Sequence, residues 1–150
     1  MKLDRYEFDV HEEDAYVQYE FFSHGSKGVI RKFIRFYKLD DTFYNLSFGD
    51  NIIGTEDFSD EMTSNNGDTE KVLITVAAAS MKFSLTYPGV MINAEGSTPA
   101  RSRLYRIYLN KYRKIINKYF FIYGRFTNGD WEKFRKNENY IALAVKRKNY

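Results

Sequence analysis

The chain of 150 residues has no cysteine, two histidines, two prolines and one tryptophan. Without cysteine it can have neither disulfide bonds nor thiolate chemistry, which fits a reducing compartment. His11 and His24 both lie near the N-terminus, so a histidine metal site or a serine–histidine pair would need the fold to bring them to another polar segment. No metal-ligand pattern, nucleotide-binding loop or catalytic triad is recognisable. We therefore expect neither a metal nor a cofactor.

Long apolar runs are also missing. The first residues, MKLDRYEFDVHEED, contain no apolar signal region, and no run approaches the ~18 residues of a membrane span. These absences predict a cytoplasmic protein with no membrane partner. Aromatic residues are abundant, with 13 tyrosines and 13 phenylalanines, which favours a β-rich fold. The length predicts a single domain over residues 1–150.

The net charge is only +3, but the charges are unevenly distributed. Residues 96–129 hold eight of the 23 basic residues and none of the 20 acidic ones. Such asymmetry indicates either a face that binds a polyanion or an acidic half that pairs internally with a basic half. The eight basic residues are Arg101, Arg103, Arg106, Lys111, Arg113, Lys114, Lys118 and Arg125.

Hydrophobic alternation and turn residues divide the chain into expected strands and helices. Strands are expected at residues 6–10, 15–23, 29–39, 42–48, 90–93, 120–126 and 140–146. Helices are expected at residues 69–87 and 99–119, with a short one at 131–137. Strands first and alternation afterwards predict an α+β fold, a largely antiparallel β-sheet with two main helices packed on one face.

The segment 51–68 is the least regular part of the chain. Its acidic residues have no basic residue nearby in the sequence, which predicts a solvated acidic loop rather than a site for a hard cation. Within it SNNGD, at residues 64–68, contains an Asn-Gly turn, and Asp68 is placed to cap the next helix. The acidic residues in and beside the segment are Asp50, Glu56, Asp57, Asp60 and Glu61.

The second long helix has a well-marked start. Ser97 or Thr98 can cap it, Pro99 suits the first helical position, and Gly96 allows a tight turn before it. The first-turn N–H groups would point into the space beside this turn, which favours an anion. Arginines at 101 and 103 occupy a turn that usually prefers acids. They call for an opposing acidic group, either internal, such as Glu95, or a bound phosphate or carboxylate.

Steps of 100° per residue divide this helix into an apolar and a basic side. Arg103, Arg106, Arg113 and Lys114 share the basic side, which is either a polyanion-binding face or a solvated surface. Arg101 falls on the apolar side, where it either pairs with a buried carboxylate or points toward a cleft. The apolar stripe consists of Leu104, Tyr108, Tyr112, Ile115 and Tyr119.

Two polar motifs carry a resemblance. SNNGDxxKVLxTVAA at 64–78 and EGSTPARSRLY at 95–105 resemble the signatures of an uncharacterised family of small stand-alone bacterial proteins, a domain of unknown function. The segment YEFFSHGSKGVIRKFIRF is similar to the opening hairpin of that family. The resemblance implies a bacterial cytosolic protein and brings no established activity. Because a hydrophobic core alone does not need such polar, glycine-bearing segments, they indicate a site.

Three functions remain open. We expect binding of a phosphate-bearing ligand, with nucleic acid favoured, through the start and the basic face of the second helix. The alternatives are a small toxin-like nuclease that uses Arg101, Tyr105, Glu95 and Asp68, and an antitoxin- or immunity-like module whose basic helix meets an acidic protein. The expected ligand-binding residues are Gly96, Ser97, Thr98, Arg101, Arg103, Arg106, Arg113, Lys114, Asn65, Asn66 and Asp68.

Overall fold

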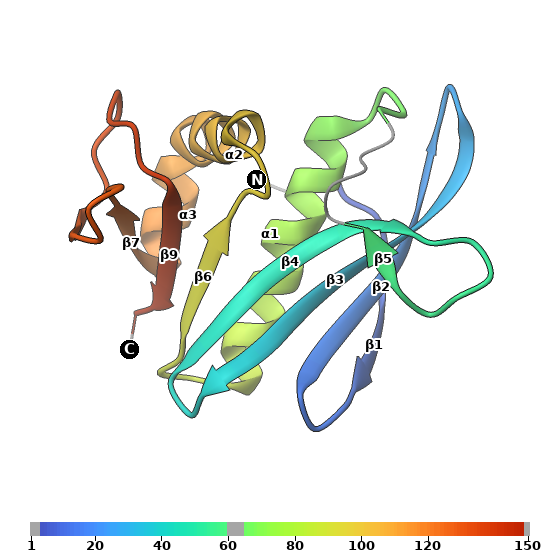
Figure 1. Cartoon of the computed structure of the whole chain (residues 1–150), viewed down its shortest axis with the longest axis horizontal. Helices are drawn as coiled ribbons and strands as arrows, with labels where there is room; N and C mark the ends of the chain where they lie inside the picture. The colour runs from blue at the N-terminus through green and yellow to red at the C-terminus, as the bar shows by residue number, and fades with distance from the viewer. Residues whose placement is uncertain (1–3, 60–64, 149–150) are drawn as a thin grey trace.

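The computed structural model describes residues 4–59 and 65–148, in which one β-sheet carries helices over one of its faces (Figure 1). The helices are α1 (Thr69–Thr86), α2 (Pro99–Lys111) and α3 (Arg113–Tyr119). The strands are β1 (Asp9–Glu12), β2 (Tyr16–Gly25), β3 (Gly28–Asp40), β4 (Phe43–Asn51), β5 (Phe58–Ser59), β6 (Met91–Glu95), β7 (Phe120–Arg125), β8 (Trp131–Lys133) and β9 (Ala142–Arg147). This confirms the expected α+β class.

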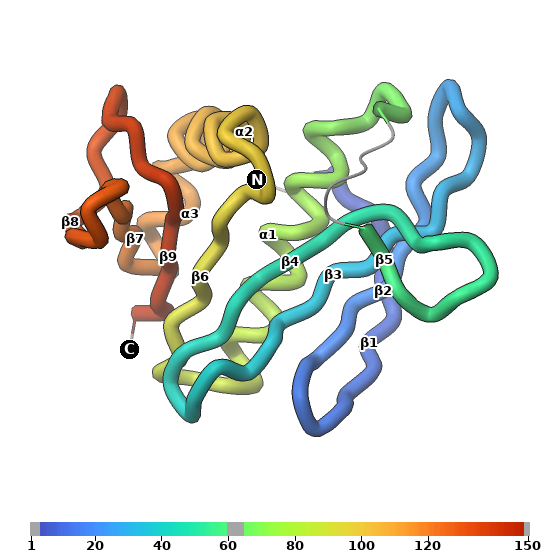
Figure 2. Tube along the Cα trace, viewed as in Figure 1, coloured from blue at the N-terminus to red at the C-terminus, as the bar shows by residue number. Residues whose placement is uncertain are grey.

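The strand order is β1-β2-β3-β4-β6-β9-β7-β8, and the short β5 pairs with β4. Every pairing is antiparallel except that of β4 with β6, which is parallel. Parallel neighbours need a crossover, and α1 supplies it. The tube in Figure 2 shows that α1 and α2 both begin at the edge where β4 and β6 end. The two polar motifs therefore lie at the same edge of the sheet.

Aromatic residues form half of the main core. Phe83 of α1 stacks on Phe36 of β3, with ring centroids 4.2 Å apart and planes at 4°, and Tyr44 of β4 meets the same ring edge-on at 5.0 Å. A second cluster of Ile122, Phe134, Tyr140 and Leu143 lies under α2 and α3. The abundance of aromatic residues in the sequence thus serves the packing of helices on the sheet.

Two expected elements differ from the structure. The helix expected at 99–119 is broken at Tyr112, where φ is −102° and ψ is 15°, so that α2 and α3 are separate helices. The short helix expected at 131–137 is wrong, because β8 occupies its first part and pairs with β7. The alternation of Trp131 and Lys133 about Glu132, after the turn at Gly129, allows this pairing.

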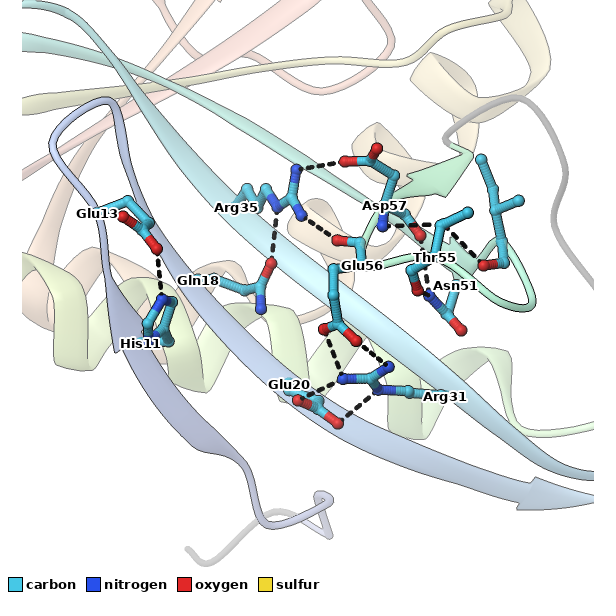
Figure 3. A network of polar contacts seen from close by, with 11 residues as sticks. His11, Glu13, Gln18, Glu20, Arg31, Arg35, Asn51, Thr55, Glu56 and Asp57 are labelled. Atoms are coloured by element: carbon cyan, nitrogen blue, oxygen red, sulfur yellow. Dashed lines mark hydrogen bonds and ion pairs between the residues drawn. The ribbon is translucent and has the colours of Figure 1, made fainter.

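The expected solvated acidic loop is found in the described part of segment 51–68, where the Glu56 and Asp57 side chains are 79% and 74% exposed, but this loop is also bound to the sheet. Its carboxylates and carbonyls bind two arginines of β3, as Figure 3 shows. Arg31 Nη2 lies 3.0 Å from Glu56 Oε2, and Arg35 Nη2 donates to the Glu56 carbonyl at 2.6 Å. The hydrogen bond from Arg31 lowers the pKa of the Glu56 carboxyl group. Asp60 and Glu61 lie outside the described residues.

Candidate nucleic-acid interface

The turn before α2 closes on its own helix. Thr98 is the cap, and its hydroxyl accepts the Arg101 N–H at 3.2 Å, while Pro99 is the first helical residue as expected. The Gly96 N–H donates to the Ser102 hydroxyl at 3.1 Å. A Cβ on Gly96 would lie 2.4 Å from the Ser102 nitrogen. Glycine is therefore needed for the approach of the helix, and Ser102 fills space that the sequence assigned to an anion.

Arg101 is buried, as the helical projection predicts, with 9% of its surface exposed. Its Cζ lies 5.4 Å from the centre of the Phe48 ring, and its Nη1 donates to the Ser97 hydroxyl at 3.3 Å. Within the described ranges no carboxylate forms an ion pair with it, so the expected internal pair is not found there. Glu95, the expected partner, instead lies 2.5 Å from Arg125. Arg101 is thus held by an aromatic ring and a hydroxyl group.

The SNNGD motif joins the start of α1 to the β2–β3 hairpin. Asn66 is 1% exposed, and its amide nitrogen donates to the Gly28 carbonyl at 2.9 Å and to the Ser23 hydroxyl at 3.1 Å. Its side-chain oxygen accepts the Lys27 N–H at 2.6 Å. Both amide hydrogens of Asn66 are therefore used inside the protein. Asn65 is exposed, and Ser64 lies outside the described residues.

Asp68 does not cap α1 with its side chain, which corrects the expectation. The carboxylate accepts the Tyr6 hydroxyl at 2.6 Å and also the Ser23 hydroxyl. Burial, and next the hydrogen bond to Asp68, raises the pKa of the Tyr6 hydroxyl. These contacts hold the N-terminal segment against the hairpin, which gives Asp68 a structural role.

A cleft of about 910 Å³ separates α1 from α2 and α3. Its floor is formed by β4, β6, β7 and β9, and its helical walls are mostly apolar. Tyr108, Tyr112, Ile115 and Tyr119 of the expected stripe line it, whereas Tyr105 lines it where Leu104 was expected. The helices that follow the two polar motifs therefore do not pack tightly on each other.

One polar clasp crosses between the walls of the cleft. Glu70, at the start of α1, accepts a hydrogen bond from the Tyr112 hydroxyl and lies 2.9 Å from Lys111 Nζ. The bond from Tyr112, and next that from Lys111, lowers the pKa of the Glu70 carboxyl group. The break between α2 and α3 occurs at this same tyrosine.

The nuclease candidates have their contacts in different places. Asp68 binds the hairpin side of α1, Glu95 pairs with Arg125, and Arg101 rests on Phe48. Tyr105 also packs on Phe48, at 5.6 Å between ring centroids. Arg101 and Tyr105 are thus brought together, while the two carboxylates that would move a proton are held elsewhere. In the part of the chain described, no group of three or more His, Asp or Glu residues could hold a metal ion.

The expected basic side of α2 and α3 faces away from the cleft. Arg103 and Lys114 are exposed, and Arg106 and Arg113 are half-buried. Arg106 Nη1 donates to the Tyr140 carbonyl at 2.6 Å, and Arg113 Nη2 donates to the Phe134 carbonyl at 3.0 Å. Both arginines thereby bind the segment that joins β8 to β9. We call the surface formed by these four cations the helical basic face.

The helical basic face differs from the cations of β3. Arg31, Lys32 and Arg35 each form an ion pair with a carboxylate. Among residues 4–59 and 65–148, no cation of the helical basic face forms an ion pair with a carboxylate. The described acidic loop therefore pairs with β3, and on α2 Lys111 pairs with Glu70, whereas the four cations of the helical basic face keep their charge.

A second exposed group, on β7 and β8, was not predicted from the sequence. Phe121 is 44% exposed and Trp131 41%. The signal was the alternation of residues 120–125, in which Phe120 and Ile122 are buried while Phe121 lies on the other side. The pairing of β8 with β7, which places Trp131 on the same side of the sheet as Phe121, could not be predicted from the turn before Trp131.

Comparisons with known proteins place the chain in a family. No described helix is both long and apolar enough to cross a membrane. Neither the comparison with curated proteins nor that with solved structures found a match. Residues 2–148 match the family model described as a family of unknown function, DUF6934. Because the match spans nearly the whole chain, the protein belongs to this family.

Proposed function

We propose that the protein binds nucleic acid through the helical basic face. The observation that carries the proposal is the contrast between two sets of cations. Those of β3 are neutralised by carboxylates, whereas Arg103, Arg106, Arg113 and Lys114 lack such partners among the described residues. Like charges gathered on one helical surface repel each other, and a polyanion removes this cost.

The two half-buried arginines suit phosphate binding. Each guanidinium group has five N–H donors, and one nitrogen of Arg106 and one of Arg113 are held by backbone carbonyls. These bonds orient the groups and thereby lower the entropy that is lost when a phosphate binds. Arg103 and Lys114, which are exposed, add charge at both ends of the surface. The turn at Gly96 contributes less to phosphate binding, because the Gly96 N–H already donates to the Ser102 hydroxyl.

The test is the salt dependence of binding to fluorescein-labelled RNA and DNA, measured by fluorescence anisotropy. About four phosphate contacts predict a log–log slope of roughly −3 to −4. Arg103→Ala and Lys114→Ala should each flatten the slope by about 0.7–0.9 and leave the melting temperature unchanged. Lys38→Ala is the matched control, because Lys38 is an exposed cation paired with Asp41 on the sheet. If neither nucleic acid binds at low salt, the proposal is lost.

A further inference from the structure

The face of the sheet that carries no helix has an ordered set of side chains on β7, β8 and β9. Register partners in an antiparallel pair point to the same face. Phe121 lies opposite Lys146, Tyr123 opposite Lys133, and Arg125 opposite Trp131. Their neighbours Phe120 and Ile122 are buried on the helical side. Aromatic and basic residues therefore share one side of β7 and β8, and β9 adds Lys146 beside Ala142 and Ala144.

Two of the rings on this face follow one strand, and the third lies on the next strand. Alternate residues of a strand are about 6.6–6.8 Å apart, so Phe121, Tyr123 and the position of Arg125 follow each other at that spacing. Trp131 lies beside Arg125 on β8, the last strand of the sheet. Large exposed aromatic side chains leave apolar area in water, which often marks a binding surface. Phe121 and Tyr123 on β7 and Trp131 on the neighbouring strand therefore offer three stacking positions.

Positive charge surrounds these rings. The Arg125 Cζ lies 5.6 Å from the Trp131 ring centre, and the Lys148 Nζ lies 5.3 Å from that of Phe121. Lys133 is exposed. Over β6, β9, β7 and β8, Glu95 is the one carboxylate on this face, and Arg125 holds it at 2.5 Å. The patch as a whole is both aromatic and cationic.

We propose that this face is a stacking platform for single-stranded nucleic acid, with bases on Phe121, Tyr123 and Trp131 and phosphates beside Lys133, Lys146 and Lys148. Every base has a flat face that can stack on an aromatic ring, and a cationic groove holds the backbone. A duplex keeps its bases stacked inside, so it cannot use such rings. The occupant is therefore a single strand of RNA or DNA.

The platform and the helical basic face meet through one segment. Arg106 and Arg113 bind the carbonyls of Tyr140 and Phe134, which lie between β8 and β9. Because β8 is the edge strand, a single strand that leaves the platform at Trp131 passes this segment toward α2 and α3. The inference rests on the proposed function and assigns to it the class of nucleic acid.

The test uses the full chain with a labelled 12-nucleotide single-stranded RNA and the duplex of the same length. Trp131 is the only tryptophan, so its fluorescence should be quenched by the single strand and not by the duplex. Phe121→Ala should weaken single-strand binding by about 5–150-fold, because the variant loses the stacking of one base. The salt slope should stay unchanged, because no charge is removed. Phe121→Tyr should retain binding, and Lys133→Ala should flatten the slope by about 0.7.

Phe22→Ala is the matched control, because Phe22 on β2 is 45% exposed and has no role in the platform. Circular dichroism and melting temperature show whether each variant folds. The platform is overturned if the single strand does not quench Trp131 fluorescence and Phe121→Ala binds with unchanged affinity. In that case, weaker binding by Arg103→Ala would still support the helical basic face. If Phe121→Ala weakens binding but Arg103→Ala and Lys114→Ala do not, the platform is supported and the proposal for the helical basic face is overturned. Absence of all binding at low salt overturns both.

Discussion

Asn66 shows how one residue can join distant parts of the chain. Its side chain binds the β2–β3 hairpin through three hydrogen bonds, and its carbonyl accepts the Ser26 N–H at 3.2 Å. The hairpin must therefore leave room for it. A Cβ on Gly25 would lie 1.8 Å from the Asn66 carbonyl oxygen, and that oxygen belongs to the backbone. Glycine at position 25 is required by this contact rather than by its own dihedral angles.

We expect Gly25→Ala to lower the free energy of unfolding by roughly 1–3 kcal/mol or more, because overpacking forces the backbone apart. Chemical denaturation with urea measures the change. Gly129→Ala is the control, since Gly129 has φ of +93° and no atom within 4 Å of the added Cβ. It should cost about 1 kcal/mol from the backbone conformation alone. Equal stability of Gly25→Ala and the wild type would contradict the docking of Asn66.

At the scale of elements, α1 and α2 are joined by the clasp of Glu70 with Lys111 and Tyr112. Hydrogen bonds from Tyr112 and Lys111 lower the pKa of Glu70 in the folded protein. A carboxyl group with a depressed folded pKa adds stability above its unfolded pKa, and the stability is lost as pH falls through the folded value. The clasp is therefore strongest at neutral pH and weakens in acid.

We expect the melting temperature of the wild type to fall more steeply than that of Glu70→Gln as the pH decreases from 7 to 3. At neutral pH the variant should be the less stable protein, and the two curves should converge in acid because Glu70 is then protonated in both states. Scanning calorimetry across this range checks the prediction. Glu7→Gln serves as a control on the N-terminal segment. Parallel curves at all pH values would show that the clasp contributes nothing.

The cleft between the helices gives two neighbouring alanines opposite environments. Ala78 lines the cleft, whereas Ala79 is completely buried in the main core. A larger apolar side chain at position 78 would enter the open cleft and cover the apolar side chains of its floor. Ala78→Met should therefore stabilise the protein by about 0.5–2 kcal/mol. The same substitution at position 79 overpacks the core and should destabilise it by about 1–3 kcal/mol. Thermal denaturation of both variants tests the cleft, and destabilisation by both would mean that it is closed in solution.

At the scale of the whole molecule, charge is divided between two regions. The described acidic loop pairs with β3, as Figure 3 shows, and the helical basic face stays positive at the other end of the sheet. Within the basic segment 96–129, for which internal pairing was one expectation, Lys111 pairs with Glu70 and Arg125 with Glu95, whereas the described loop pairs with β3 instead. The carboxylates of the loop reach the arginines of β3 because β5 pairs with β4, the neighbour of β3. This pairing places the loop across the sheet.

The sequence by itself determined most of the elements. Turn residues and hydrophobic periodicity placed β2, β3, β4, β7 and α1, since these signals depend only on neighbours in the chain. The N-terminus of α2 was also readable, because Thr98 and Pro99 act locally. The helical projection placed Arg101 on the inner side and Arg103 on the outer side, as observed.

Only the tertiary structure decided which partners these residues have. The contacts of Asp68 with Tyr6, of Glu95 with Arg125 and of Asn66 with the hairpin join residues 30 or more positions apart. No local pattern encodes them. The break at Tyr112 coincides with a contact to Glu70 across the cleft. The aromatic and basic side of β7 became a surface only when β8 and β9 paired beside it without a helix above, because strand register decides which side chains share a face.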